Sequence, residues 1–398
     1  MTWRSNSPGA EMKHRALWPI PLLLLLTGCS LLSGKDNADP PAELVELQNS
    51  LKIETLWDDG FEGAEGAQLK LKPAYKDGVL YLAEPSGGVY AVDAENGKTL
   101  WSVDLDTPLS GGPGVGEGLV ALGSLEADLI VLDATDGSER WRQRVGSEVL
   151  STPAIRGGYV VCRTADGGVA AYTADAGERR WLYDRSVPVL SLRGDSSPVI
   201  GESRVIAGFA GGKLIGLSLD AGLVTWEAEI SVPQGRTELE RVVDIDADPK
   251  LVEGTVYVAA FQGDVAAVSE SSGVVLWRRK LSSHAGLDAS WRNLFVTDAN
   301  DHVWALDTSN GAALWQQKEL HARRLTAPAM VGEYLVVGDL EGYVHWLSQD
   351  DGRQLARIKV GSDPIRYKPL VVYDVVYILD EGGTLTALQA HPIETEQP

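Results

Sequence analysis

The sequence has few of the residues on which several kinds of functional site depend. Its 398 residues include two cysteines, Cys29 and Cys162, and six histidines. Two distant cysteines exclude a C-x-x-C-H haem motif, and the histidines show neither metal-ligand spacing nor an H-E-x-x-H pattern. Cys162 lies in an alternating run, YVVCR, that is typical of a strand, so we predict that it is a buried structural thiol.

Positive charge is also scarce. The chain has 35 Lys and Arg against 56 Asp and Glu, a formal net charge of −21. Proteins that bind nucleic acid neutralise its phosphates with Lys and Arg. The acidity therefore excludes a nucleic acid or another polyanion as the main partner.

Residues 1–28 have the pattern of an export signal. Three basic residues precede an apolar run, 16–26, that is shorter than the ~20 residues of a membrane-spanning helix. The run ends in LTGC at Cys29, which resembles the bacterial lipobox, in which the cysteine is lipidated before cleavage. The pattern predicts a mature chain anchored by several acyl chains on Cys29 and a tether over 29–50. By the same resemblance, Ser30 implies transport to the outer membrane. The alternative is an ordinary secretory signal with a chance cysteine.

One motif recurs along the rest of the chain. A copy such as GVYAVDAENGKTLW has an alternating run, a turn with glycine, and a second short strand that ends in Trp. A further hairpin precedes each copy, so each unit has four short strands in ~40 residues, the period of a β-propeller blade. Six copies end at Trp101, Trp141, Trp181, Trp226, Trp277 and Trp315, and a degenerate copy, YVHWLSQDDGRQLA, has Ala356 at that position.

The two ends of the repeat region complement each other. The last copy, GGTLTALQA, lacks an outer strand, and the segment IETLWDD with Trp57 can supply it. We therefore predict an all-β, eight-bladed β-propeller of four-stranded antiparallel blades over 51–390. An N-terminal strand in the last blade closes the ring, and a tail follows at 391–398. An open array of hairpin units is the alternative.

Two neighbouring connections between blades are longer than the others. A proline follows Trp101 by 12 residues and Trp315 by 13, but it follows Trp181 by 17 and Trp226 by 23. The added residues fall at about 182–197 and 227–248, and antiparallel blades place such connections on one face. The first contains apolar residues beside an arginine and the second contains alternating aspartates, a composition that suits a protein interface.

The Trp-ended repeats, of the form A-x-D-x-x-x-G-x-x-x-W, resemble those of quinoprotein dehydrogenases, whose eight-bladed propellers bind pyrroloquinoline quinone. With the lipobox, the length and the loop SVPVLSLRGDSSPVI, the chain resembles the BamB family more closely. Those propeller lipoproteins serve the Gram-negative machine that folds β-barrels into the outer membrane. The resemblance implies a lipid-anchored scaffold on the periplasmic face of the outer membrane, without catalysis or cofactor. Its expected partners are a POTRA domain of BamA, the rest of the assembly complex and, as a further possibility, unfolded outer-membrane proteins. The matching L-S-L-R-G loop and D-x-D segment imply BamA contacts at Leu190, Leu192, Arg193, Asp244 and Asp246.

Other interpretations of these residues remain open. A quinone-dependent dehydrogenase requires a metal ion with carboxylate and amide ligands. The acidic residues that recur in the repeat, among them Asp93, Asp133 and Asp307, are better explained by turn hydrogen bonds. The two leucines can also pack beneath their own loop, with Arg193 paired to an aspartate. A third alternative is a propeller that binds another envelope protein.

Overall fold

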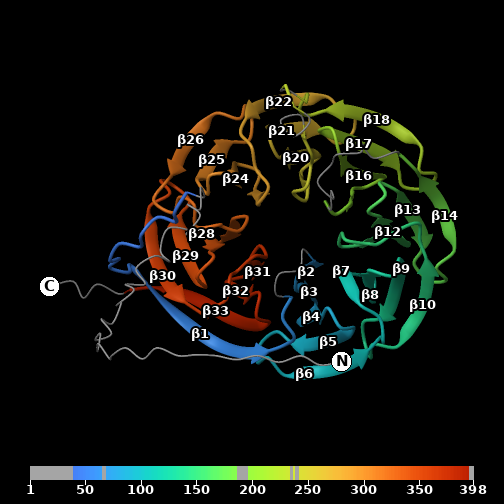
Figure 1. The fold of residues 1–398 in the computed structure, drawn as a ribbon, viewed down its shortest axis with the longest axis horizontal. Coiled ribbons are helices and arrows are strands. Elements are labelled where there is room, and N and C mark those ends of the chain that lie inside the picture. Colours follow the sequence, from blue (N-terminus) through green and yellow to red (C-terminus); the bar gives the residue numbers. More distant parts are fainter. Residues whose placement is uncertain (1–38, 65–68, 186–195, 234–235, 238–241, 394–398) are drawn as a thin grey trace, which may run out of the picture. The chain divides into compact units, whose positions relative to one another are not determined.

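The repeats fold into four-stranded antiparallel sheets, and eight of these sheets surround a common centre as the blades of a β-propeller (Figure 1). The computed structural model describes residues 39–64, 69–185, 196–233, 236–237 and 242–393, and the blades lie in the unit Pro40–Pro398. The predicted fold class is confirmed. Within the described residues there is no helix long and apolar enough to cross a membrane.

The blades follow one another along the chain, each with its strands in order from the centre outwards. Blade 1 consists of β3 (Ala74–Lys76), β4 (Val79–Ala83), β5 (Gly88–Asp93) and β6 (Thr99–Asp104); blade 2 of β7 (Leu109–Gly116), β8 (Leu119–Ser124), β9 (Asp128–Asp133) and β10 (Glu139–Arg144); blade 3 of β11 (Ala154–Arg156), β12 (Tyr159–Arg163), β13 (Val169–Thr173) and β14 (Arg179–Tyr183); blade 4 of β15 (Val199–Ile200), β16 (Arg204–Phe209), β17 (Lys213–Ser218) and β18 (Val224–Glu229).

The second half of the ring repeats this order. Blade 5 consists of β19 (Lys250–Val252), β20 (Thr255–Ala259), β21 (Asp264–Ser269) and β22 (Val275–Lys280); blade 6 of β23 (Gly286–Ala289), β24 (Asn293–Thr297), β25 (Val303–Asp307) and β26 (Ala313–Gln317); blade 7 of β27 (Ala329–Val331), β28 (Tyr334–Gly338), β29 (Tyr343–Ser348) and β30 (Gln354–Lys359); blade 8 of β31 (Leu370–Val372), β32 (Val375–Leu379), β33 (Thr384–Pro392) and β1 (Leu51–Gly60). The short strand β2 (Lys70–Leu71) adds to blade 2, parallel to β7.

The core lies between neighbouring blades. The second and third strands of each blade are buried on both faces, so β8 and β9 read as nearly continuous apolar runs instead of alternating ones. Cys162 in β12 is fully buried, and burial raises the pKa of its thiol to about 12. The prediction of a buried structural thiol is therefore confirmed.

An indole side chain from most blades binds the turn of the next blade. Trp277 in β22 donates its Nε1–H to the carbonyl oxygen of Thr308 at 2.7 Å. Its ring also covers Gly311, where an added Cβ would lie 2.6 Å from the indole Cε3 atom. Gly311 has φ +72°, a left-handed conformation that glycine adopts without strain. The same two contacts recur for Trp57 with Ala94 and Gly97, Trp101 with Ala134 and Gly137, Trp141 with Ala174 and Gly177, Trp181 with Leu219 and Gly222, Trp226 with Glu270 and Gly273, and Trp315 with Gln349 and Gly352.

The boundary between blades 7 and 8 is built differently. Trp346 in β29 pairs with Ala356 in β30, so the large and the small residue have exchanged strands relative to the other blades. Blade 8 has no turn between β33 and β1 to receive an indole. Instead, the chain that leads into β1 lies there, and the backbone N–H of Ser50 donates to the carbonyl oxygen of Leu355 at 2.7 Å. Trp346, fully buried, fills the volume from the opposite strand.

The N-terminal strand closes the ring. β1 pairs antiparallel with β33 from Leu51 opposite Pro392 to Gly60 opposite Thr384. Trp57 stands opposite Ala387, the pairing that a single hairpin makes in blade 1 between Trp101 and Ala91. The predicted composite blade is confirmed, and it leaves neither end of the repeat array with an open edge.

The contact between indole and glycine predicts unequal effects of two similar substitutions. Gly254 is also left-handed, at φ +76°, but nothing lies within 4 Å of an added Cβ. Gly254→Ala should therefore cost only the left-handed backbone strain, about 1–2 kcal/mol. Gly311→Ala should cost about 1–3 kcal/mol more, because it also displaces the Trp277 ring. Denaturant unfolding midpoints measure both variants, and equal losses would contradict the proposed role of this contact.

Candidate functional site

The two enlarged connections lie on one face of the ring. They run over 184–198, between β14 and β15, and over 230–249, between β18 and β19, whereas the link from β6 to β7 takes only 105–108. In an antiparallel blade, the connections to the next blade and the turns between the second and third strands emerge at the same end. Both connections therefore share this face, which we call the connection face, and they flank blade 4.

Most of the predicted site lies outside the described residues. Leu190, Leu192 and Arg193 fall within 186–195, and Cys29 falls within 1–38. Their expected roles stay predictions. Asp244 and Asp246 are described, and both lie on the connection face.

Both ends of the first enlarged connection are held by specific contacts. At its start, the Arg185 guanidinium forms an ion pair with Glu227 at 3.2 Å and lies 6.0 Å from the centre of the Phe209 ring. At its end, the backbone N–H of Ser197 donates to Oδ1 of Asp248 at 2.6 Å. Asp248 belongs to the second enlarged connection, so the two connections are joined directly.

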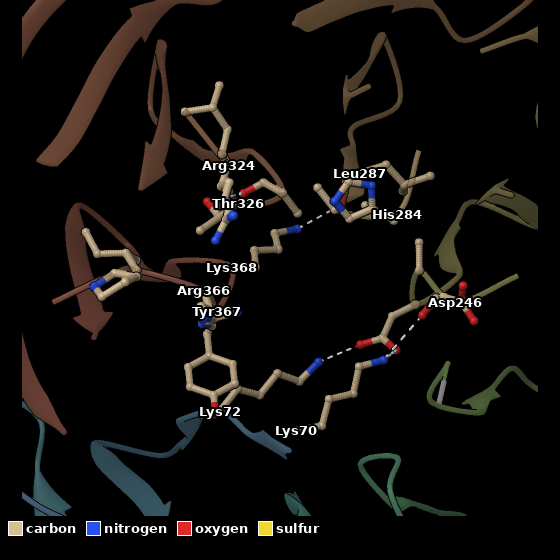
Figure 2. A pocket seen from close by; sticks show the side chains of 18 of the residues that line it. Lys70, Lys72, Asp246, His284, Leu287, Arg324, Thr326, Arg366, Tyr367 and Lys368 are labelled. Carbon is tan, nitrogen blue, oxygen red and sulfur yellow. Dashed lines mark hydrogen bonds and ion pairs between the residues drawn. The ribbon is translucent and has the colours of Figure 1, made fainter. Parts of the chain in front are cut away.

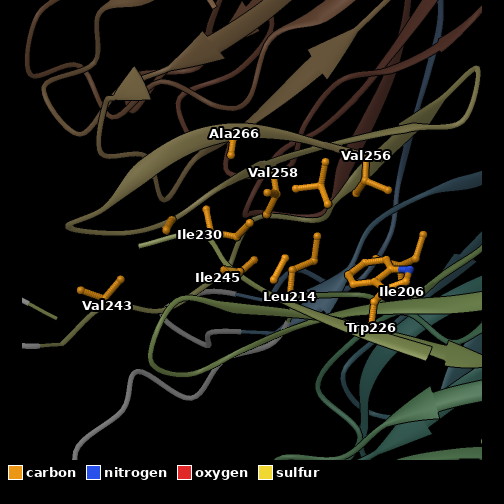
Figure 3. Packing of buried hydrophobic residues seen from close by; sticks show 12 residues of the cluster. Ile206, Leu214, Trp226, Ile230, Val243, Ile245, Val256, Val258 and Ala266 are labelled. Carbon is orange, nitrogen blue, oxygen red and sulfur yellow. The ribbon is translucent and has the colours of Figure 1, made fainter. Parts of the chain in front are cut away.

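The second enlarged connection is wedged between blades 4 and 5. Val243 and Ile245 are buried in the cluster that fills this boundary (Figure 3). Asp244, between them, is 2% exposed, and its backbone and carboxylate bind both blades. Its carbonyl oxygen accepts from the N–H of Phe261 at 2.8 Å, and its Oδ1 accepts from the N–H of Gly211 at 3.2 Å. Asp244 thus holds the segment in place.

Asp246 and Asp248 line a pocket at the centre of the ring, and Figure 2 labels Asp246 among the lining residues. The Asp248 carboxylate binds Lys70 Nζ at 3.1 Å and Lys72 Nζ at 2.6 Å, and Lys70 also donates to the carbonyl oxygen of Asp246 at 3.3 Å. Burial alone would raise the pKa of Asp248, but the two lysines and the Ser197 N–H hold it well below its usual value. Asp248 therefore ties both enlarged connections to the segment that precedes blade 1.

A second carboxylate shares two lysines in the same way. Asp288 binds Lys250 Nζ at 3.0 Å and Lys368 Nζ at 3.1 Å, and Lys368 also donates to the carbonyl oxygen of Leu287 at 3.1 Å. Burial would raise the pKa of Asp288, but Lys368 and Lys250 lower it. Burial also lowers the pKa of Lys368, to about 8. These contacts join blades 5, 6 and 8 across the pocket.

The acidic residues that recur in the repeat serve the turns. The Oδ1 atoms of Asp93, Asp133 and Asp307 accept backbone N–H bonds from the residues two positions later, at 2.7–2.8 Å. The prediction that these aspartates act in turns is confirmed. The part of the chain that the structure describes has no group of three or more His, Cys, Asp or Glu residues that could hold a metal ion.

Sequence reasoning missed the central role of Asp248, the last aspartate of the pattern D-I-D-A-D. Its lysine partners stand 176 and 178 residues away, so no local pattern links them. The alternating D-I-D-A-D pattern was the available signal. In an extended segment, this alternation places the three carboxylates on one side and the apolar residues on the other.

Comparisons with known proteins point to one family. The sequence profile of a family described as "Outer membrane protein assembly factor BamB" matches residues 85–317 and 309–392. A curated relative with that name from Pseudomonas aeruginosa is 49% identical over 95% of this chain and 98% of its own length. Among solved structures, BamB from Moraxella catarrhalis has a TM-score of 0.77 at 25% identity, covering 85% of this chain and 100% of its own. The quinohemoprotein alcohol dehydrogenase of Comamonas testosteroni reaches 0.65 at 14% identity, over 87% and 78%, a likeness of fold alone.

The Asp248 cluster predicts a loss of stability that depends on pH. Asp248→Asn should lower the free energy of unfolding by about 2–3 kcal/mol at pH 7, because it leaves two partly buried lysines without their carboxylate. Since the pKa of Asp248 is lowered in the folded protein, its stabilisation is complete above the ordinary value of 3.8. It is lost as the pH falls through the lower folded-state pKa. Denaturant unfolding of wild type and variant across the acid range measures the difference.

The matched control for this prediction is Asp58→Asn, which changes an exposed carboxylate on β1. It should have almost no effect at any pH. A deficit of Asp248→Asn that stayed constant well below pH 3.8, or a deficit equal to that of the control at pH 7, would contradict the assignment.

Proposed function

This chain belongs to the family of the outer-membrane protein assembly factor BamB, and we propose on that premise that it is a non-catalytic scaffold that binds BamA. The propeller presents its connection face to a POTRA domain of BamA. In this way it helps the assembly complex to deliver or insert outer-membrane proteins. The observation that carries the proposal is the pair of enlarged connections on one face, joined to each other through Asp248 and Ser197.

The frame of the propeller supports this assignment because it limits the entropy cost of binding. An ion pair of Arg185 and a hydrogen bond of Ser197 hold the two ends of the first connection. Hydrogen bonds of Asp244 hold the second connection between blades 4 and 5. Residues held in this way lose less conformational freedom when a partner binds them.

The composition of the connections fits a protein partner. We propose that Leu190 and Leu192 act as apolar anchors and that Arg193 pairs with a carboxylate or stacks on a side chain of BamA. Of the two aspartates, Asp246 is partly exposed and can contact the partner, whereas Asp244 acts by holding the segment between blades 4 and 5. The negative charge of Asp246 would favour one orientation of the partner.

We further propose that acyl chains on Cys29 anchor the protein to the outer membrane, with the propeller in the periplasm. The domain division is 1–28 for the signal, 29–50 for the tether, 51–390 for the propeller and 391–398 for the tail. Unfolded outer-membrane proteins are proposed as transient partners of the same complex.

The residues of the central pocket do not fit the metal that quinoprotein chemistry requires. Calcium prefers several carboxylate and carbonyl oxygens that are not already neutralised. Here Asp248 and Asp288 each bind two lysines, so a divalent cation beside them would meet an excess of positive charge. The pocket therefore favours the scaffold over the dehydrogenase.

The proposal predicts where the protein contacts BamA in cells. A photo-crosslinking residue at Leu192 should give an adduct with BamA, because Leu192 is a proposed anchor of the interface. The control position is Ser138, in a turn on the opposite face, which should give none. Immunoblotting of intact cells after irradiation measures both.

Absence of an adduct at Leu192, with export and lipidation unchanged, would contradict the proposed interface. Equal adducts from Leu192 and Ser138 would also contradict it, because they would indicate contact without a preferred face.

A further inference from the structure

The central pocket reverses the charge balance of the chain. Acidic residues outnumber basic ones overall, 56 to 35, but the pocket has six cationic side chains and four carboxylates in its lining, and a fifth carboxylate, Asp288, binds two of the six cations. Its volume is about 750 Å³, within the range of small-molecule sites. The cationic residues are Lys70, Lys72, Lys250, Arg324, Arg366 and Lys368.

The lysines of the pocket are paired two to one with carboxylates. Lys70 and Lys72 share Asp248, and Lys250 and Lys368 share Asp288, so each cluster keeps one net positive charge. An ammonium group has three N–H donors. The described contacts of Lys72 use one of them, so its ammonium keeps donors for a further acceptor.

Arg324 adds a cation whose guanidinium forms no ion pair with the residues that the structure describes. Among the described residues, none accepts a hydrogen bond or forms an ion pair with its guanidinium, although its side chain lines the pocket (Figure 2). Its backbone is held in the left-handed region, at φ +51°. The Asp301 carboxylate fixes this conformation by accepting the N–H groups of Arg324 at 2.9 Å and of Leu325 at 2.8 Å. These two hydrogen bonds hold the backbone that carries the Arg324 side chain at the pocket.

We propose that the central pocket is a binding site for a small multivalent oxyanion, a ligand with phosphate or carboxylate groups. Arg324 and Lys368 contact the ligand from blades 7 and 8, and Lys72 approaches from the segment before blade 1. The oxygens of such a ligand accept charge-assisted hydrogen bonds from the Arg324 guanidinium and from ammonium N–H groups, such as those of Lys72, that the described ion pairs do not use. Asp246 lines the pocket and is also a proposed BamA contact, so the two proposals are tested on different residues, Arg324 here and Leu192 above, and either can fail without the other.

The test is calorimetric titration of the purified full-length protein in detergent, in chloride buffer at constant ionic strength. The probes are inorganic phosphate and citrate. We expect saturable binding of at least one probe, with a Kd of about 1 mM or lower. Phosphate binding alone assigns the site to phosphate groups, citrate binding alone assigns it to carboxylates, and no saturable binding of either overturns the proposal.

Variants distinguish binding of the anion in the central pocket from nonspecific electrostatic binding to the protein surface. Arg324→Gln breaks no described side-chain contact, and we expect it to weaken binding about tenfold or more, as does Lys368→Met. Glu381→Gln releases Arg366 from its ion pair at 2.7 Å and should tighten binding. The control, Lys98→Met, removes an exposed lysine from a turn on the opposite face. Binding that Arg324→Gln leaves unchanged, or that Lys98→Met weakens equally, overturns the proposal.

Discussion

The structure depends on one repeated contact, in which the indole of one blade covers a left-handed glycine in the turn of the next and donates its N–H to a carbonyl oxygen there. The contact joins two separate sheets, so it sets how each blade sits on its neighbour. Trp277 with Gly311 and Thr308 is one example, and six other boundaries repeat it. The eighth boundary cannot, because blade 8 is assembled from both ends of the chain. There Trp346 and Ala356 exchange places, and the chain before β1 takes the position of the missing turn.

Because these contacts set the arrangement of the blades, the connections between blades can be long without changing that arrangement. The described residues at the bases of the enlarged connections are held by packing, hydrogen bonds and ion pairs. Val243 and Ile245 enter the core between blades 4 and 5, and Asp248 binds Ser197 together with two lysines from before blade 1. The same carboxylates give the centre of the ring its charge pattern, so the connection face and the central pocket share residues.

The sequence predicted most of the fold because each repeat carries its own turn glycine, alternating strand and terminal Trp. The composite blade followed from an outer strand missing at one end and present at the other. The copy YVHWLSQDDGRQLA contains both Trp346 and Ala356, but the repeat pattern predicts only the loss of the terminal Trp, not an indole on the neighbouring strand in its place. The Asp248 and Asp288 clusters could not be predicted, since Lys70, Lys72 and Lys368 lie far along the chain from these carboxylates and reach them only when the ring closes. The burial of Asp244 could not be predicted either. The alternation of Asp244 with Val243 and Ile245 indicates an extended segment, but it does not show that blades 4 and 5 cover both sides of that segment.

The central claim is that the connection face is the docking surface of this propeller. Hydrogen–deuterium exchange of the full-length protein, with and without the periplasmic region of BamA, tests it most directly. The account predicts slower exchange on complex formation in 184–198 and 230–249 and unchanged exchange in the turns of the opposite face. Protection confined to the opposite face or to the outer strands, with both connections unchanged, would contradict it.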